Sequence, residues 1–238
     1  MNYEIGGPEL SYSRPLLEVI DLGRKAFEPV VAIQERLVEE RRGGRIADTL
    51  LLVEHESVYT LGRNAKEDNV LASPDDLRSR GIRVVRASRG GDVTYHGPGQ
   101  LVGYPILHMG ERDKGVLWYI GGLEQALILA LADFGVAAGT DRRNRGVWVG
   151  NDKIAAIGVR VTRRITMHGF ALNVCTDLSF YRAINPCGMT DAGVTSLAFV
   201  CPGIRMDAVK ARVVERFRQV FEYGECRWSK HRSESPPG

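Results

Sequence analysis

One cysteine of this 238-residue chain has neighbours that would expose its sulfur. Cys187 lies in residues 184–188 (INPCG), where Pro186 fixes the approaching backbone and Gly188 leaves one side of the sulfur uncovered. Such a thiol can attack an acyl group after it loses its proton, because the thiolate is the reactive species. We interpret the other cysteines as small buried residues: Cys175, Cys201 and Cys226.

A nearby positive charge would favour the ionised sulfur of Cys187. By residue type, His96, His168 and Lys153 all compete for this role. Histidine is the usual partner of a cysteine nucleophile. Distance along the chain does not select one of the three, so at this point all remain open.

Residues 89–100 (RGGDVTYHGPGQ) hold four glycines in twelve positions, more than a connecting turn between two strands needs. Glycine lets the backbone approach a ligand closely, and His96 adds a side chain that exchanges a proton near neutral pH. These features indicate a ligand-binding loop. The alternative is a structural glycine-rich loop whose histidine caps a backbone carbonyl.

Lys153 precedes a run of small and apolar residues, 154–158 (IAAIG). Ala155, Ala156 and Gly158 are too small to fill a core by themselves, so this strand could leave room for an acyl chain. Residues 168–171 (HGFA) have a similar character. Taken by itself, Lys153 is better explained as a surface lysine that closes a hairpin.

Hydrophobic periodicity predicts the elements that position these residues. Helices are expected at 27–42, 116–134 and 208–221, the first two followed by a terminating glycine. The wholly apolar run 49–53 indicates a strand buried on both faces. Other strands are expected at 57–61, 82–86, 101–107, 146–149, 153–161 and 165–174.

Residues 150–152 (GND) have the composition of a tight hairpin turn, which would place Lys153 at the mouth of the hairpin. Strands dominate the middle of the chain and long helices interrupt them irregularly. This order favours an α+β fold, a mixed β-sheet flanked by helices, over strict βαβ alternation.

Composition narrows the class of protein. With 44% apolar and 26% charged residues the chain resembles ordinary globular proteins, and we expect one catalytic domain at 1–228 with a mobile tail at 229–238. A net charge of +3 does not indicate nucleic-acid binding. Four scattered cysteines without a CxxC pair, and no signal-peptide or membrane-spanning stretch, predict a cytoplasmic protein.

Two arginine clusters have two interpretations, a solvated rim or a docking surface for an acidic protein partner: Arg142, Arg143 and Arg145, and Arg160, Arg163 and Arg164. The sequence has no phosphate-binding GxxxxGK[ST] loop, no GxGxxG after a strand and no zinc-like spacing of Cys and His. No cofactor or metal is therefore expected.

Taken together, these segments resemble the octanoyl-carrier-protein:protein N-octanoyltransferase family, also called lipoyl(octanoyl) transferases. Residues 139–145 (GTDRRNR) depart from the family's usual pattern. The resemblance rests on residues 50–63 (LLLVEHESVYTLGR), 89–105 (RGGDVTYHGPGQLVGYP), 146–158 (GVWVGNDKIAAIG), 168–174 (HGFALNV), 184–188 (INPCG) and 195–197 (TSL).

The resemblance implies a fold like that of the biotin and lipoate protein ligases. The family's acyl-accepting cysteine falls on Cys187, and the lysine that lowers its pKa falls on Lys153. Its substrate-binding segments fall on Arg89, Gly90, Gly91, Asp92, Val93, Thr94, Tyr95, His96, Ala156, Ile157, Gly158, Gly169, Phe170 and Ala171.

The resemblance also implies a reaction and its partners. Octanoyl-acyl-carrier protein would be the donor, and lipoyl domains of 2-oxoacid dehydrogenases and the glycine cleavage H protein would be acceptors. We expect a monomer that passes the octanoyl group through a Cys187 thioester to a lysine of the acceptor. The alternatives are an ATP-dependent lipoate or biotin protein ligase, which needs no cysteine nucleophile, and a non-catalytic acyl-binding module.

Overall fold

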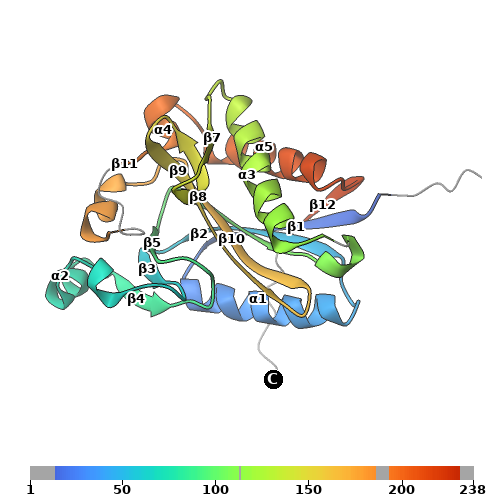
Figure 1. Cartoon of the computed structure of the whole chain (residues 1–238), viewed down its shortest axis with the longest axis horizontal. Helices are drawn as coiled ribbons and strands as arrows, with labels where there is room; N and C mark the ends of the chain where they lie inside the picture. The colour runs from blue at the N-terminus through green and yellow to red at the C-terminus, as the bar shows by residue number, and fades with distance from the viewer. Residues whose placement is uncertain (1–13, 113, 186–192, 231–238) are drawn as a thin grey trace, which may run out of the picture.

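A mixed sheet forms the centre of the protein (Figure 1). The structure, a computed structural model, describes residues 14–112, 114–185 and 193–230. In this part of the chain nine strands share one sheet, with β11 (Gly193–Val194) paired beside β9. The other eight follow in the order β12 (Glu225–Lys230), β1 (Leu16–Lys25), β2 (Asp48–His55), β6 (Gln100–Ile106), β10 (Ile165–Asn173), β9 (Asp152–Thr162), β8 (Asn144–Val149) and β7 (Gly139–Asp141).

Helices cover both faces of this sheet. Figure 1 shows α1 (Phe27–Arg42) below it and α3 (Val116–Ala132) with α5 (Met206–Val220) above it. The apolar run of β2 is fully buried because its alternate side chains enter the two cores, Leu50 and Leu52 on the α3 side and Leu51 and Val53 on the α1 side. The predicted α+β fold, a mixed sheet flanked by helices, is confirmed.

The sheet combines both strand directions. β1 runs parallel to β12 and β2, while β6, β10, β9, β8 and β7 continue as antiparallel neighbours. Antiparallel strands need only short turns, and the β8–β9 turn at Gly150 and Asn151 is the tight hairpin that the sequence predicts. Gly150 takes a positive φ of 59° there.

A second sheet of three strands carries part of the glycine-rich segment. Its order is β4 (Arg83–Arg86), β3 (Val58–Leu61) and β5 (Val93–His96). The expectation of a loop over 89–100 is therefore wrong at residues 93–96, which pair antiparallel with β3 in the register Val58↔His96. Shorter elements pack around it: η1 (Glu67–Asn69), α2 (Pro74–Ser79) and η3 (Leu178–Ala183).

The sequence did not predict the edge strand β12 or its neighbour β1. β1 and β12 pair parallel although some 200 residues separate them, with Ile20 opposite Ser229 and Asp21 opposite Lys230. β12 therefore continues two residues past 228, where the tail was expected to begin. Two further short elements are η2 (Met109–Arg112) and α4 (Leu197–Val200). None of the described helices is long and apolar enough to cross a membrane.

Candidate active site

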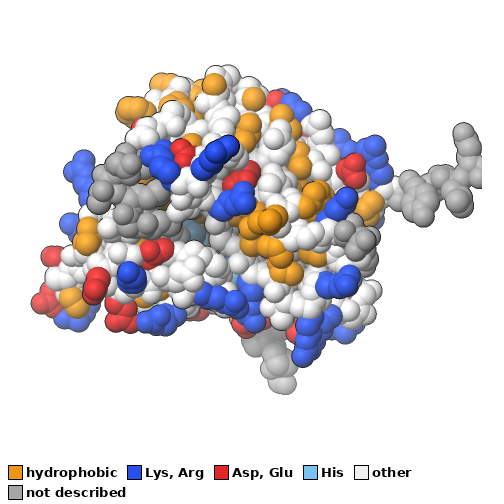
Figure 2. Space-filling model, in the orientation of Figure 1, with side chains coloured by type: hydrophobic (Ala, Val, Ile, Leu, Met, Phe, Trp, Pro, Cys, Tyr) orange, Lys and Arg blue, Asp and Glu red, His pale blue; other side chains and the backbone are white. Residues whose placement is uncertain are grey.

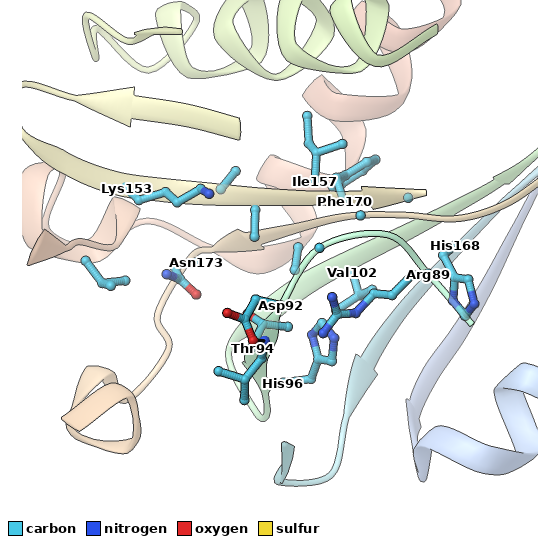
Figure 3. Close-up of a pocket in the computed structure, with 18 of the residues that line it drawn as sticks. Arg89, Asp92, Thr94, His96, Val102, Lys153, Ile157, His168, Phe170 and Asn173 are labelled. Carbon is cyan, nitrogen blue, oxygen red and sulfur yellow. Dashed lines mark hydrogen bonds between the residues drawn. The ribbon is translucent and has the colours of Figure 1, made fainter. Parts of the chain in front are cut away.

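A cavity lies between the glycine-rich segment and strands β9 and β10 (Figure 3). Its volume of about 90 Å³ is several times the ~10–15 Å³ that one water requires. The space-filling view shows a hollow on this face in which pale-blue histidine atoms are visible, with Lys and Arg side chains around it (Figure 2). The cavity is thus open to molecules from outside.

Lys153 lies at one end of the cavity, in the second position of β9. Its Nζ donates a hydrogen bond to Asn144 Oδ1 at 3.0 Å and lies 5.4 Å from the centre of the Trp148 ring. The hairpin mouth predicted for Lys153 is confirmed. Its backbone carbonyl accepts from the Thr195 N–H at 3.0 Å, so the 195–197 (TSL) segment is fixed beside it.

Cys187 lies outside the residues that the structure describes. The chain on both sides of residues 186–192 is placed against the cavity. Asn185 N–H donates to the carbonyl of Asn69 at 2.8 Å, and Asn69 Nδ2 donates to the cavity-lining Asp92 at 2.6 Å. On the other side Val194 lines the cavity and pairs with Lys153 in the β11–β9 ladder.

Most of the predicted residues of segment 89–96 line the cavity, but two do not. Gly90 is joined to β9 by its N–H, which donates to the Val159 carbonyl at 3.0 Å. The Tyr95 ring packs in the core of the second sheet, where it contacts the rings of Tyr59 and Phe180. The residues that do line the cavity are Arg89, Gly91, Asp92, Val93, Thr94 and His96.

His96 is held as a neutral ring. Gln100 donates its amide N–H to Asn173 Oδ1 at 3.0 Å, which leaves Gln100 Oε1 to accept from His96 Nδ1 at 2.7 Å. His96 Nε2 is then the acceptor nitrogen. Burial lowers the pKa of His96 well below 6.5, and the charges of His55 and Arg89 act in the same direction. The expected proton exchange near neutral pH is therefore wrong for His96.

His168 is also neutral. Burial, with the charges of Arg89 and Arg160, lowers its pKa from 6.5 to about 4. Its Nε2 lies 3.0 Å from Ser88 Oγ, and its backbone has a φ of 58°, a left-handed value rare outside glycine. Of the three competing cations, the two histidines are thus unsuited to carry a positive charge at neutral pH.

Strands β9 and β10 give the cavity a wall of small residues. Ala156 lies opposite Ala171 and Gly158 opposite Gly169 in the ladder. The Phe170 ring packs directly over Gly103 of β6. Only glycine leaves room for it, because a Cβ on residue 103 would lie 2.1 Å from the ring. All six residues predicted on these strands line the cavity: Ala156, Ile157, Gly158, Gly169, Phe170 and Ala171.

Other lining residues were not predicted. Asn173 belongs to the 168–174 (HGFALNV) segment, so its place in that segment was a usable signal. Asn144 and Tyr181 come from β8 and η3, and only folding brings them to the cavity. Among the described residues, no group of three or more His, Cys, Asp or Glu side chains could hold a metal ion.

The arginine clusters have mixed surroundings. Arg143 donates to the Asp141 carboxylate at 2.8 Å and to Asn151 Oδ1 at 2.9 Å. Arg145 lies 3.6 Å from the carboxylate of Glu124. Internal ion pairs like these reduce the charge available to a partner, and docking of an acidic protein there remains a prediction.

Residues 27–218 match the sequence profile of the lipoyl protein ligase A/B catalytic domain. An octanoyltransferase of Solibacter usitatus is 49% identical over 85% of this chain and 91% of its own length. Among solved structures, lipoate-protein ligase A bound with ATP has a TM-score of 0.77 at 16% identity, over 91% of this chain and 89% of that one. The biotin protein ligase of Aquifex aeolicus in complex with biotin and ATP has a TM-score of 0.55 at 14% identity, over 86% and 70%.

Proposed function

This chain belongs to the octanoyltransferases of the lipoyl protein ligase A/B catalytic-domain family, and from that membership we infer that it transfers an octanoyl group to lipoyl-carrying proteins. The observation that best supports the inference is the position of Lys153 at one end of a cavity walled by alanine and glycine. An acyl chain can lie beside such a wall, because Ala156, Gly158, Gly169 and Ala171 leave space and the other lining residues of these strands, Ile157 and Phe170, are apolar.

We propose a two-step reaction through Cys187 and Lys153. The Cys187 thiolate attacks the carbonyl carbon of an octanoyl thioester, the donor's carbon–sulfur bond breaks, and the leaving thiolate takes a proton from the Lys153 ammonium. The octanoyl group is then a thioester on Cys187, and Lys153 is a neutral amine. The neutral character of His96 and His168 supports lysine as the cation of the pair.

In the second step the amine of the acceptor lysine attacks the Cys187 thioester. Neutral Lys153 accepts the proton that this amine loses, and the Cys187 thiolate is the leaving group. An amide bond has then formed on the acceptor, and both residues have returned to their starting charges. Because the thioester donor is already activated, no step consumes ATP.

We propose octanoyl-acyl-carrier protein as the donor, and lipoyl domains of 2-oxoacid dehydrogenases and the glycine cleavage H protein as acceptors. The arginine clusters support an acidic donor by their charge alone. We further propose a monomer in the cytoplasm with one catalytic domain, whose expected boundary at 228 moves to residue 230, where β12 ends. The scattered reduced cysteines agree with that compartment.

Intact-mass spectrometry tests the acyl-enzyme. Incubation with octanoyl-carrier protein and no ATP should add one octanoyl mass to the wild type and none to Cys187→Ala. Cys175→Ala is the matched control. The interpretation of the other three cysteines as buried is wrong, because Cys175 is exposed and Cys201 and Cys226 are partly exposed. Partial desolvation and Glu54 nevertheless raise the pKa of the Cys175 thiol and disfavour its thiolate. A Cys187→Ala enzyme that still modifies lipoyl domains would disprove the mechanism, and a requirement for ATP would favour a ligase.

The role of Lys153 is tested by alkylation of Cys187 with iodoacetamide as a function of pH. In Lys153→Met the midpoint should move to higher pH, because loss of the ammonium disfavours the thiolate. Transfer should fall at least ~100-fold, as expected when a general acid and base is removed. An alkylation profile that matches the wild type would remove Lys153 from the mechanism.

A further inference from the structure

Three alternate residues of β8 face the Lys153 side chain. Asn144, Gly146 and Trp148 are two positions apart, so they project from the same side of the strand. Lys153 lies on the neighbouring strand β9, opposite Trp148 in the ladder register. The register shifts between Val147 and Trp148, which marks a local irregularity beside the lysine.

Each of the three makes a different contact with the lysine. Asn144 Oδ1 accepts from Nζ at 3.0 Å. The ring of Trp148, which is 3% exposed, has its centre 5.4 Å from Nζ, within the range of a cation–π interaction. A Cβ on Gly146 would lie 2.6 Å from Lys153 Cε, so the side chain passes over residue 146 only because that residue is glycine.

The holding residues are tied to one another as well. Trp148 Nε1 donates to the backbone carbonyl of Asn144 at 3.3 Å, which fixes the indole relative to the amide. Gly146 N–H donates to the buried carboxylate of Glu124 on α3 at 3.1 Å. The three contacts on Lys153 are therefore made by a rigid strand face, which reduces the conformational freedom that a lysine otherwise has.

Charged groups around the lysine come from several elements. Asp92 and the neutral His96 lie across the cavity, and Asp152 precedes Lys153 in β9. Arg143 lies 5.0 Å from the centre of the Trp148 ring. Glu124 lies beneath Gly146 with Arg145 beside it. Asn144 and Trp148, which both contact Nζ, are uncharged, and both favour the ammonium over the amine.

We propose that Asn144 and Trp148 are positioning residues that hold the Lys153 ammonium toward the cavity and set the pH at which it loses its proton. Asn144 belongs to residues 139–145, which depart from the family's usual sequence pattern, whereas Gly146 and Trp148 belong to the segment 146–158 on which the resemblance rests. The proposal deepens the proposed function, because it rests on Lys153 exchanging protons in both steps.

The test measures Lys153 directly. Acetic anhydride modifies the free amine, and peptide mass spectrometry gives the modification rate at residue 153 as a function of pH. In Asn144→Leu, which has similar size and no acceptor, the midpoint should fall by about one unit. In Asn144→Asp, which adds a negative charge, it should rise by about one unit. Trp148→Leu should lower it and Trp148→Phe should restore part of the change.

Turnover gives the second measurement. Asn144→Leu should slow octanoyl loading of Cys187 about tenfold, whereas Asn144→Asp should load normally and slow transfer to the lipoyl domain, because its lysine releases the proton less readily. Asn151→Ala is the matched control: Asn151 lies in the same hairpin but accepts from Arg143. This control should keep the wild-type midpoint and rate.

Two results would overturn the proposal. One is a wild-type midpoint for Lys153 in both Asn144 variants. The other is a Lys153 midpoint that moves in the same direction in Asn144→Leu and Asn144→Asp while both variants melt at a lower temperature. That result would indicate that Asn144 has a purely structural role. The modification rate needs no turnover, so it tests the holding of Lys153 even if Cys187→Ala proves active and the proposed mechanism fails.

Discussion

The two ends of the cavity are built from opposite kinds of chemistry. At the Lys153 end a partly buried amine is held by Asn144 and Trp148. At the far end the ionisable side chains are rigid and buried: Arg89 donates to the Thr60 carbonyl at 2.6 Å, and His168 contacts Ser88. Figure 3 shows Lys153 on one side of the cavity and Arg89 with His168 on the other.

This difference is consistent with the proposed function, in which one cavity combines proton exchange with binding of an apolar chain. A group that exchanges protons must reach both charge states at similar cost, which partial exposure and neutral partners permit. At the far end, burial keeps both histidines neutral, so the charge on these two side chains stays constant near neutral pH. Changes at that end should therefore affect stability and chain length more than proton exchange.

The largest expected effect is that of Gly169→Ala. The new Cβ would lie 2.2 Å from the Gly103 carbonyl oxygen and 2.7 Å from Pro105 Cδ, and neither can move without moving β6. We expect a loss of at least ~3 kcal/mol in the free energy of unfolding, measured by urea denaturation. Gly121→Ala in α3 is the control, since a Cβ there meets nothing within 4 Å and should stabilise the helix by up to about 1 kcal/mol. Equal stability of both variants would contradict the packing described for β6 and β10.

The next effect concerns pH and His168. The unfolded chain binds a proton at this histidine near pH 6.5, but the folded protein does so only near 4. Stability is therefore complete above 6.5 and is lost as the pH falls toward 4, by on the order of 2 kcal/mol between pH 7 and pH 5. His168→Asn removes the titration and tolerates the positive φ. Urea unfolding at these two pH values should show a smaller loss in the variant; an equal loss would mean that His168 is charged in the folded state.

The smallest expected effect is a change in acyl chain length. In Gly158→Ala the new Cβ would lie 3.0 Å from the Gly90 carbonyl oxygen and 3.1 Å from Arg89 Cδ, which narrows the far end. We expect kcat/KM for octanoyl relative to hexanoyl donors to fall about tenfold, the effect of roughly one methylene group. Gly139→Ala, which meets nothing within 4 Å and lies on the edge strand β7, should keep the wild-type ratio. If both variants keep the wild-type ratio of kcat/KM for octanoyl over hexanoyl donors, the acyl tail does not end beside Gly158.

Elements with a strong local pattern were predicted well. The α1 helix has the predicted bounds, and β2 is buried on both faces as its apolar run indicated. β5 was missed because four residues between glycines carry no local period, and it becomes a strand only by pairing with β3. β12 was missed for a similar reason, since its polar sequence acquires strand structure from β1.

The residues of the candidate site also fall into those that the sequence predicts and those that only the tertiary structure identifies. Residue types and family motifs in the sequence selected Cys187, Lys153 and three cavity segments, twelve of whose fourteen residues line the cavity. The sequence could not exclude Gly90 and Tyr95, because side-chain direction depends on strand pairing. It also could not choose among three cations by residue type.

The sequence by itself determined the fold class, the family and the residues able to do the chemistry, because periodicity, turn residues and motif spacing are local properties of the chain. Tertiary structure alone decided which ionisable groups stay neutral and which neighbours hold the lysine. The physical reason is that burial and hydrogen bonding set a pKa, and both arise when β3, β5, β8, β9 and β10, distant in the chain, pack around one cavity.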